Sequence, residues 1–359
     1  MLEHIELILS LFLLFYVLII LYDVMSLFSK KTEITRNDKK RNILINLIVA
    51  YENEQDKKEK KKINKKLINK LKRLSYLSNL GTLLEKNVKI KSLKNKEIID
   101  ILSNHSYDSI FIALASIYNK KDSLTKSYYA YILKYVHPDR EEIYKFLYSC
   151  ILTPSIYSVE IALFTFYNIG DSSKVCEAYK IMNRENIYYN HKLISDGIME
   201  FTGSKKELCN ELYQNFDIFN EEIKIGFLTF FRNCGYDIGD ELLKRLQTEN
   251  MEKEVEIAMI RYFSKIYSEK ANKLFIRRIK ENYYHDFDYD IVMIQVLGQM
   301  KELSKEVIEV LVSCLSNPNY YVRYNAGKVL HNKIDLRTIK NVKDPFMKDM
   351  IEYFISQEV

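Results

Sequence analysis

The sequence predicts an all-α protein in which an N-terminal membrane-spanning helix is followed by a stack of helix pairs. Glycine and proline are scarce, at 9 and 4 of 359 residues, which disfavours a β-rich fold with many tight turns. No charged residue occurs between Leu7 and Tyr22. Further along the chain, apolar residues four positions apart recur about every 33 residues. This period fits one antiparallel helix pair per repeat.

The N-terminal run is apolar on all sides of a helix. Thirteen of the sixteen residues from Leu7 to Tyr22 are Leu, Ile, Phe or Val. At about −0.4 kcal/mol each, these residues contribute about −5 kcal/mol to the free energy of insertion into a bilayer. A helix from Ile5 to Phe28 would be about 36 Å long, against about 30 Å of hydrocarbon. We therefore expect a transmembrane anchor over residues 1–29 and a lipid bilayer as a partner.

Two other interpretations of this segment are disfavoured. A cleavable signal peptide begins with basic residues and ends at a small-residue site, whereas this chain begins with Glu3, His4 and Glu6 and has no Ala-x-Ala site. A buried core helix is disfavoured because the run is apolar on all faces, lies at the extreme terminus of the sequence and is followed by lysines. Basic residues begin at Lys30 and Lys31, and such residues stay on the cytoplasmic side. The prediction is a single-pass protein of the cell membrane, with the N-terminus outside and the bulk of the chain cytoplasmic.

The next region, residues 30–81, is basic and predicted to be helical. The net charge of the chain is +6, and residues 30–73 alone hold sixteen Lys/Arg and six Asp/Glu. After a connector from Ser29 to Asn37, we predict a helix that begins at Asn37 or Asp38 and ends near Glu54. A second helix is predicted from Lys57 to Gly81, with one apolar face and one lysine face.

The lysine face is a candidate surface for anionic lipid headgroups, where each cation contributes about 1 kcal/mol. An ordinary solvated helix face is the alternative, and the two interpretations are compatible. The candidate residues are Lys57, Lys58, Lys60, Lys61, Lys62, Lys65, Lys66, Lys70, Lys72 and Arg73.

A stretch near the C-terminus carries a recognisable repeat pattern. The sequence from Leu315 to Leu330 reads LSNPNYYVRYNAGKVL. A helix is predicted to begin after Asn317, with proline in its first turn. The run resembles a HEAT repeat, in which an Asn-Pro or Asp-Pro turn leads into a V-R-x-x-A-x-x-x-L helix. The resemblance implies structural roles for five residues, with the arginine bound to carbonyl groups of a neighbouring repeat or to an acid. These residues are Pro318, Val322, Arg323, Ala326 and Leu330.

The same apolar pair recurs upstream, which extends the repeat pattern over residues 82–359. Before residue 250 the likeness consists of periodicity alone, so an irregular helical bundle is the alternative to a HEAT-like solenoid. The marker pairs are Ile132 and Val136, Leu163 and Tyr167, Gly197 and Phe201, Phe227 and Phe231, Met259 and Phe263, Met293 and Leu297, and Ala326 and Leu330.

No pattern in the sequence predicts an enzyme, a metal site or a cofactor. The segment from His285 to Asp290 has ligand-type side chains, but it contains no glycine for a ligand loop and is placed where helix caps are expected. The segment from His137 to Glu142 is typical of a helix start. Nucleophile-elbow, phosphate-loop, dinucleotide and zinc-protease motifs do not occur. A Cys–His pair brought together by the fold stays open as an alternative.

The five cysteines and the net charge of residues 74–359 disfavour further classes of function. The five cysteines form no C-x-x-C pair, and we expect them to be reduced and structural. Residues 74–359 are close to neutral, which speaks against a nucleic-acid groove. We expect no nucleic-acid partner.

The function that this pattern favours is a non-enzymatic scaffold that binds another protein. The binding surface is expected on the concave side, formed by the second helix of each repeat, for example Val307 to Leu315. The layout is similar to small membrane-anchored HEAT proteins of low-GC bacteria that accompany envelope-polysaccharide enzymes, which implies a membrane glycosyltransferase as the partner. Two alternatives remain: an anionic-lipid or nucleic-acid module acting through residues 57–73, and a solenoid enzyme similar to HEAT-like DNA glycosylases. The enzyme alternative predicts a positive groove on the repeat surface, which the near-neutral charge of residues 74–359 disfavours.

Overall fold

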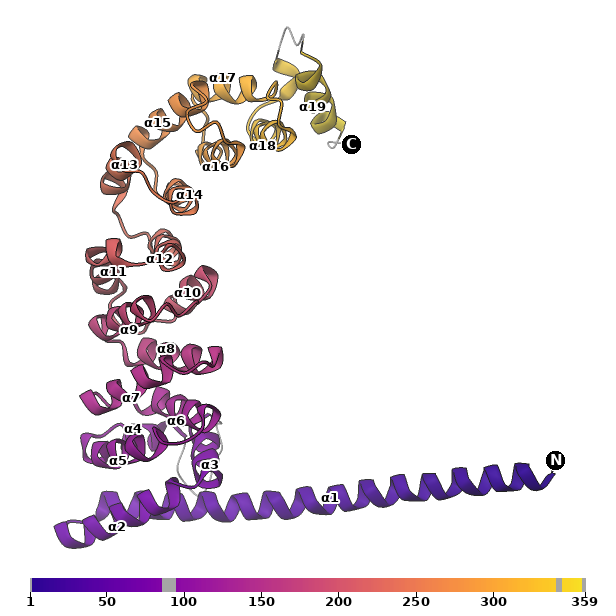
Figure 1. Cartoon of the computed structure of the whole chain (residues 1–359), viewed down its shortest axis with the longest axis vertical. Helices are drawn as coiled ribbons and strands as arrows, with labels where there is room; N and C mark the ends of the chain where they lie inside the picture. Colours follow the sequence, from indigo (N-terminus) through magenta and orange to yellow (C-terminus); the bar gives the residue numbers. More distant parts are fainter. Residues whose placement is uncertain (1, 86–94, 340–343, 357–359) are drawn as a thin grey trace. The chain divides into compact units, whose positions relative to one another are not determined.

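The computed structural model describes residues 2–85, 95–339 and 344–356, and all of their side chains except those of residues 2–14, 28, 95 and 96. The regular structure in these ranges is helical throughout (Figure 1), which confirms the predicted helical content. The chain divides into two compact units, Met1–Ile169 and Gly170–Val359.

The first unit is built from long and short helices that pack on one another in sequence order. α1 contacts α2 and α3, α5 contacts α7, and α6 contacts α8. The helices are α1 (Leu2–Asn53), α2 (Lys57–Leu71), α3 (Leu74–Glu85), α4 (Asn95–Leu102), the 3₁₀ helix η1 (His105–Tyr107), α5 (Asp108–Tyr118), α6 (Ser123–Val136), α7 (Glu141–Ile151) and α8 (Ile156–Ile169).

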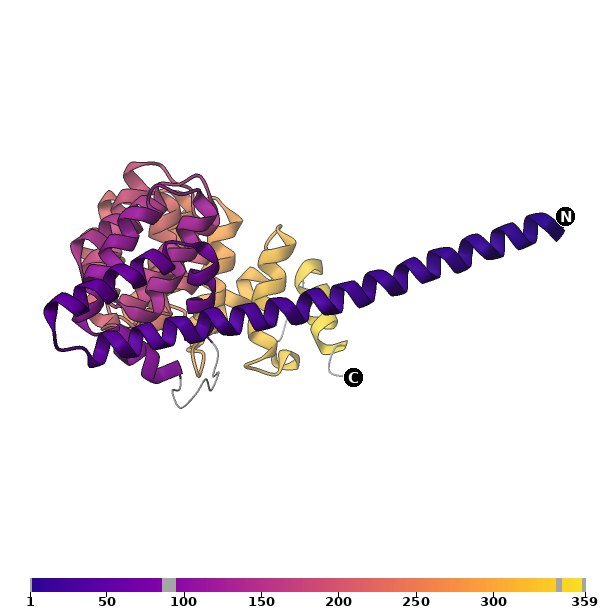
Figure 2. The ribbon, with the colours of Figure 1, turned by 90° about the horizontal axis from the view of Figure 1, so that it is seen from below.

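α1 is one continuous helix (Figure 1 and Figure 2). The connector predicted from Ser29 to Asn37 is therefore wrong, because those residues are helical. The C-terminal part of α1 buries Leu44, Ile48 and Tyr51, which anchors it against α2 and α3. A helix held in this way can continue without a break, since none of its residues is a glycine or a proline.

The apolar part of α1 overturns the prediction of a membrane anchor. Among the residues that the structure describes, no helix is both long enough and apolar enough to cross a membrane. Residues 7–14 of the predicted span have side chains outside the described ones. This finding corrects both the transmembrane anchor over residues 1–29 and the single-pass localisation with a cytoplasmic bulk.

The basic region folds as two helices where one was predicted. α2 ends at Leu71, and α3 begins at Leu74. Gly81 does not end the helix but lies inside α3, where a Cβ atom would collide with Tyr128 and Ile132 of α6. The glycine is thus explained by the close approach of α6, which local sequence patterns do not reveal.

The second unit consists of helix pairs. Its elements are α9 (Ser172–Arg184), α10 (His191–Ile198), α11 (Lys205–Gln214), the 3₁₀ helix η2 (Phe216–Ile218), α12 (Glu221–Cys234), α13 (Gly239–Thr248), α14 (Lys253–Tyr262), α15 (Glu269–Lys280), α16 (Phe287–Leu297), α17 (Lys305–Cys314), α18 (Tyr320–His331), the 3₁₀ helix η3 (Leu336–Thr338) and α19 (Pro345–Ser356).

The helices of this unit alternate between two rows. α10, α12, α14, α16 and α18 contact one another in that order, and we call them the even row. α9, α11, α13, α15 and α17 form the odd row, in which α9 contacts α11 and α15 contacts α17. Figure 1 shows α14, α16 and α18 on one side of the stack and α13, α15 and α17 on the other. This stacking of helix pairs is consistent with an α-solenoid.

The predicted marker pairs are buried in both units. Each pair lies on, or within three residues after, one of the helices α6 and α8 of the first unit and α10, α12, α14, α16 and α18 of the second, and every marker residue is buried. One detail of the prediction is wrong: α18 begins at Tyr320, two residues later than Pro318, with Asn319 as its N-cap. Val307 to Leu315, predicted to line the binding face, largely forms α17 of the odd row. That this row binds a partner stays a prediction.

Candidate functional site

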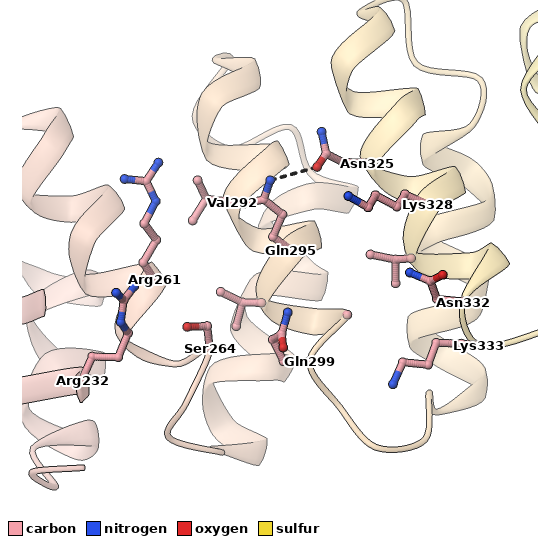
Figure 3. A pocket seen from close by; sticks show the side chains of 13 residues that line it. Arg232, Arg261, Ser264, Val292, Gln295, Gln299, Asn325, Lys328, Asn332 and Lys333 are labelled. Atoms are coloured by element: carbon pink, nitrogen blue, oxygen red, sulfur yellow. Dashed lines mark hydrogen bonds between the residues drawn. The ribbon is translucent and has the colours of Figure 1, made fainter. Parts of the chain in front are cut away.

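A polar hollow of about 500 Å³ lies on the even row of the second unit (Figure 3). Its walls come from α12, α14, α16 and α18 and from the residues that follow these helices. A second hollow of about 310 Å³ extends to α10 and shares Arg232 and Arg261 with the first. We call the two hollows together the even-row groove. Its principal polar residues are Lys192, Asp196, Thr229, Arg232, Arg261, Gln295, Gln299, Lys328 and Asn332.

The repeat register aligns the side chains of the groove. Arg261, Gln295 and Lys328 each lie two residues after the first member of a marker pair. Because those markers are buried in equivalent places, the three polar side chains project from the same side of successive helices. All three are exposed. The 500 Å³ hollow thus has a regular wall, in which α14, α16 and α18 each present one polar side chain at this position.

The 500 Å³ hollow of the groove concentrates positive charge without an acidic residue. Arg232, Arg261, Lys328 and Lys333 line the 500 Å³ hollow, and no acidic residue does. The buried Nε of Arg232 has no hydrogen-bond partner among the described residues. Burial, followed by the nearby charge of Arg261, lowers the pKa of Arg232. Figure 3 shows the two arginines extending from neighbouring helices at one end of the hollow. Asp196 lines the second hollow, but it forms no ion pair with either arginine in the described structure.

Amide side chains alternate with these cations. Gln295 donates from Nε2 to Oδ1 of Asn325 over 2.9 Å, which links α16 to α18 (Figure 3). Gln299 and Asn332 occupy equivalent places, six residues after Met293 and Ala326. Each amide offers both donors and acceptors. The alternation gives the groove the means to bind the peptide groups of another chain as well as its charges.

The floor of the hollow is apolar and tightly packed. Val292, Val296 and Val329 line it. Gly298 allows Val329 to approach α16, because a Cβ at this glycine would collide with both methyl groups of that valine. Lys333 is partly engaged at the rim, where its Nζ donates to the carbonyl oxygen of Met300 over 2.8 Å. The hollow therefore combines a polar wall with a short aliphatic strip.

The segment from His285 to Asp290 forms a helix cap and an ion-pair cluster. The side chain of Asp286 accepts from the backbone N–H of Asp288 at the start of α16. Lys253 Nζ lies 2.7 Å from Asp286 and 2.5 Å from Asp288. Within the described residues, no three His, Cys, Asp or Glu side chains gather closely enough to hold a metal ion.

Asp290 is buried in the same region, and we expect it to make stability depend on pH. Burial, with a smaller contribution from Asp286, raises its pKa to about 6. The folded protein therefore binds this proton more tightly than the unfolded chain, whose pKa is about 3.9. The stabilisation is complete below about pH 4 and is lost as the pH rises through about 6.

Replacing Asp290 with asparagine should therefore raise the free energy of unfolding by about 2–3 kcal/mol at pH 7.5. Near pH 4 it should change the stability little, because the native carboxyl is then neutral. Thermal melts of both proteins at the two pH values check this. An equal gain at both pH values would show that the carboxylate charge is not the cause.

The cysteines are free thiols in poorly reactive surroundings. Four are buried and Cys234 is half-buried. Burial raises the pKa of Cys150 and Cys314 to about 12. Nucleophilic cysteines need a lowered pKa, because the thiolate is the reactive form. These surroundings therefore do not favour the Cys–His alternative.

The lysines predicted as a binding face lie on α2 and at the break that follows it. Most are exposed, and Lys60 and Lys70 are half-buried. Nζ of Lys60 lies 4.7 Å from the ring centre of Tyr51, and Nζ of Lys70 lies 5.2 Å from that of Tyr76. These two lysines help to pack α2, whereas the exposed ones form a solvated face.

The residues of the HEAT-like run have structural surroundings. Val322, Ala326 and Leu330 are fully buried. Arg323 donates from Nη1 to the carbonyl oxygens of Asn317 and Pro318, over 2.8 and 2.9 Å. Arg323 thus closes the turn that precedes its own helix, whereas the resemblance implied carbonyl groups of a neighbouring repeat or an acid.

The chain matches no model of a known protein family, and no curated protein matches it.

Sequence reasoning missed the groove. Arg232, Arg261 and Lys328 are spread over almost a hundred residues, and their charge is hidden in a near-neutral region. A usable signal did exist, because Arg261, Gln295 and Lys328 share one place relative to the markers. Comparing the polar residues at equivalent repeat positions identifies Arg261, Gln295 and Lys328 as one row.

Proposed function

We propose that this protein is a non-enzymatic scaffold that binds another protein along the even row of its second unit. The observation that carries the proposal is the even-row groove, in which successive helices present polar side chains at one repeat position. Stacked repeats use such extended faces to bind partners. That this partner is a membrane glycosyltransferase stays a prediction from the resemblance.

We also propose that the repeats are of the HEAT type. Buried Val322, Ala326 and Leu330, together with the arginine that closes the preceding turn, support this assignment. The side chain of Asn319 accepts from the N–H groups of Tyr321 and Val322, so the turn also caps the helix.

The side chains of the 500 Å³ hollow favour binding over catalysis. This hollow is lined by cations, amides, one serine and aliphatic groups, without a carboxylate, histidine or cysteine. General acid–base and nucleophilic mechanisms depend mostly on those groups. The solenoid-enzyme alternative predicts a positive groove, which the even-row groove is, and the second hollow holds His191 and Asp196; the composition of the 500 Å³ hollow supports the binding function.

Blocking the groove should abolish partner binding. Gln299→Trp with Asn332→Trp places two bulky rings on exposed positions in the 500 Å³ hollow. The matched control carries Lys244→Trp and Glu309→Trp on exposed positions of the odd row. The tagged full chain is purified from its native cells, and the co-purified proteins are quantified by mass spectrometry. One set of partner proteins should be lost from the groove variant and retained by the control.

Retention of the same partners by both variants would contradict the proposal. A second candidate, binding of anionic lipid or nucleic acid by α2, is favoured by the exposed lysines of that helix. It predicts the reverse pattern: binding survives the tryptophan substitutions and is lost when the exposed lysines of residues 57–66 are changed to glutamine.

A further inference from the structure

The even-row groove has a pair of arginines that lack an anion. Arg232 and Arg261 belong to neighbouring helices, and both line both hollows. The Nε of Arg232 is buried without a hydrogen-bond partner in the described part of the chain. An unmade hydrogen bond at a buried polar atom costs about 1–3 kcal/mol, and more when the group is charged.

The chemistry of the pair points to carboxylates. A guanidinium offers two parallel donors that match the two oxygens of a carboxylate. The charge of Arg261 disfavours the charged form of Arg232, so an anion that contacts both arginines would relieve their repulsion. Lys328, exposed on α18, places a further cation beyond Gln295.

The remaining lining fits an extended peptide. Gln299 and Asn332 offer donors and acceptors at equivalent places in consecutive repeats, as a peptide backbone requires. The strip of Val292, Val296 and Val329 can take an aliphatic side chain. Packed helices lie about 8–10 Å apart, and an extended chain rises about 3.3 Å per residue. One repeat therefore corresponds to about three residues of ligand, and Arg261 and Lys328 to acids about six residues apart.

A nucleic acid fits the same surface less well. Single-stranded nucleic acids stack their bases on aromatic side chains, and no aromatic residue lines the 500 Å³ hollow. Residues 170–359 hold more acidic than basic residues, so a long phosphate backbone would meet repulsion outside the groove. A short acidic segment needs only the local positive charge.

We infer that the even-row groove binds an extended acidic peptide segment of the partner, with its carboxylates on Arg232, Arg261 and Lys328. This inference rests on the proposed scaffold function and specifies the ligand of the same site. It makes the groove selective by charge, because basic or neutral segments would leave the arginines unpaired and desolvated.

The probe is a fluorescein-labelled extended peptide of about twelve residues, with glutamate at every second position, so that all carboxylates lie on one face of the extended chain. Fluorescence anisotropy with the full chain should show binding that weakens with salt. The same peptide with lysine in place of glutamate should not bind. Arg232→Gln with Arg261→Gln should weaken binding at least about tenfold, since two charge-assisted hydrogen bonds are lost.

The matched control is Lys244→Gln with Arg277→Gln on exposed positions of the odd row, which should leave binding unchanged. Lys328→Gln changes only an exposed side chain and serves if the double arginine variant does not fold. Unchanged peptide binding in the groove variants overturns the inference. So does tighter binding of single-stranded DNA through the same arginines, or equal displacement of the peptide by millimolar inorganic phosphate.

The two proposals fail in different ways. If the tryptophan variants lose the partner while the glutamine variants retain it, the scaffold function stands and the acidic ligand is wrong. If the tryptophan variants retain the partner, the scaffold function itself is wrong.

Discussion

Replacing Phe227 with alanine should lower the free energy of unfolding of the second unit by about 3–5 kcal/mol. Phe227 is fully buried in α12. Its ring centre lies 5.0 Å from that of Tyr179 and 5.1 Å from that of Phe219, both edge-on. Alanine would remove these aromatic contacts and leave a cavity where α9 and the η2 segment meet the even row.

The stacked architecture predicts which helices lose local stability in the Phe227→Ala variant. In a repeat protein each unit interacts mainly with its neighbours, so hydrogen exchange should accelerate in α10, α12 and the helices beside them more than in α18. Tyr267→Ala, at a side chain that is 68% exposed, is the control and should change stability by less than about 0.5 kcal/mol. Uniform acceleration throughout the second unit would contradict the stacked arrangement.

Replacing Arg278 with methionine should cost about 3–5 kcal/mol, because it leaves a buried acid without its cation. Arg278 has only 3% of its side chain exposed, and its Nη1 lies 3.6 Å from Glu256. It also donates to the carbonyl oxygen of Leu246. Glu256 accepts hydrogen bonds from Tyr284 and Tyr289 as well, over 2.5 and 3.0 Å. The cluster ties α13, α14, α15 and the start of α16 together.

A double-mutant cycle separates the ion pair from simple packing. Adding Glu256→Gln to Arg278→Met removes the uncompensated charge while keeping an acceptor for the tyrosine hydroxyls. The double variant should therefore be more stable than the sum of the single losses predicts, by about 0.5–3 kcal/mol. Urea unfolding of the four proteins measures this coupling. Strictly additive losses would show that the charge of Glu256 is already balanced by other groups.

The repeat was predictable because the buried apolar residues recur at a regular spacing in the sequence. The markers from Ile132 and Val136 to Ala326 and Leu330 all lie in the core. The continuity of helix α1 and the close approach of α6 to α3 were not predictable. The charged and polar residues from Ser29 to Asn37 read as a connector, yet a helix passes through them. Gly81 was predicted to end a helix, but a glycine is needed there because Tyr128 and Ile132 of α6 approach its Cα closely.

The candidate site was less accessible to sequence reasoning than the core. The even row and the odd row have similar periodicity, and only packing shows that α17 belongs to the row opposite the groove. Net charge also conceals local charge, because distant arginines such as Arg232 and Arg261 meet only in the fold. The N-terminal prediction rested on composition alone, and no described helix meets the length and apolarity that it required.

The most direct test of the binding surface is hydrogen exchange of the full chain with and without saturating glutamate peptide. Our account predicts slower exchange in α12, α14, α16 and α18, because binding there reduces local opening. Exchange in α13, α15 and α17 should stay unchanged. Protection in the odd row or in α2, or no protection anywhere at saturation, would contradict the assignment of the even row as the binding face.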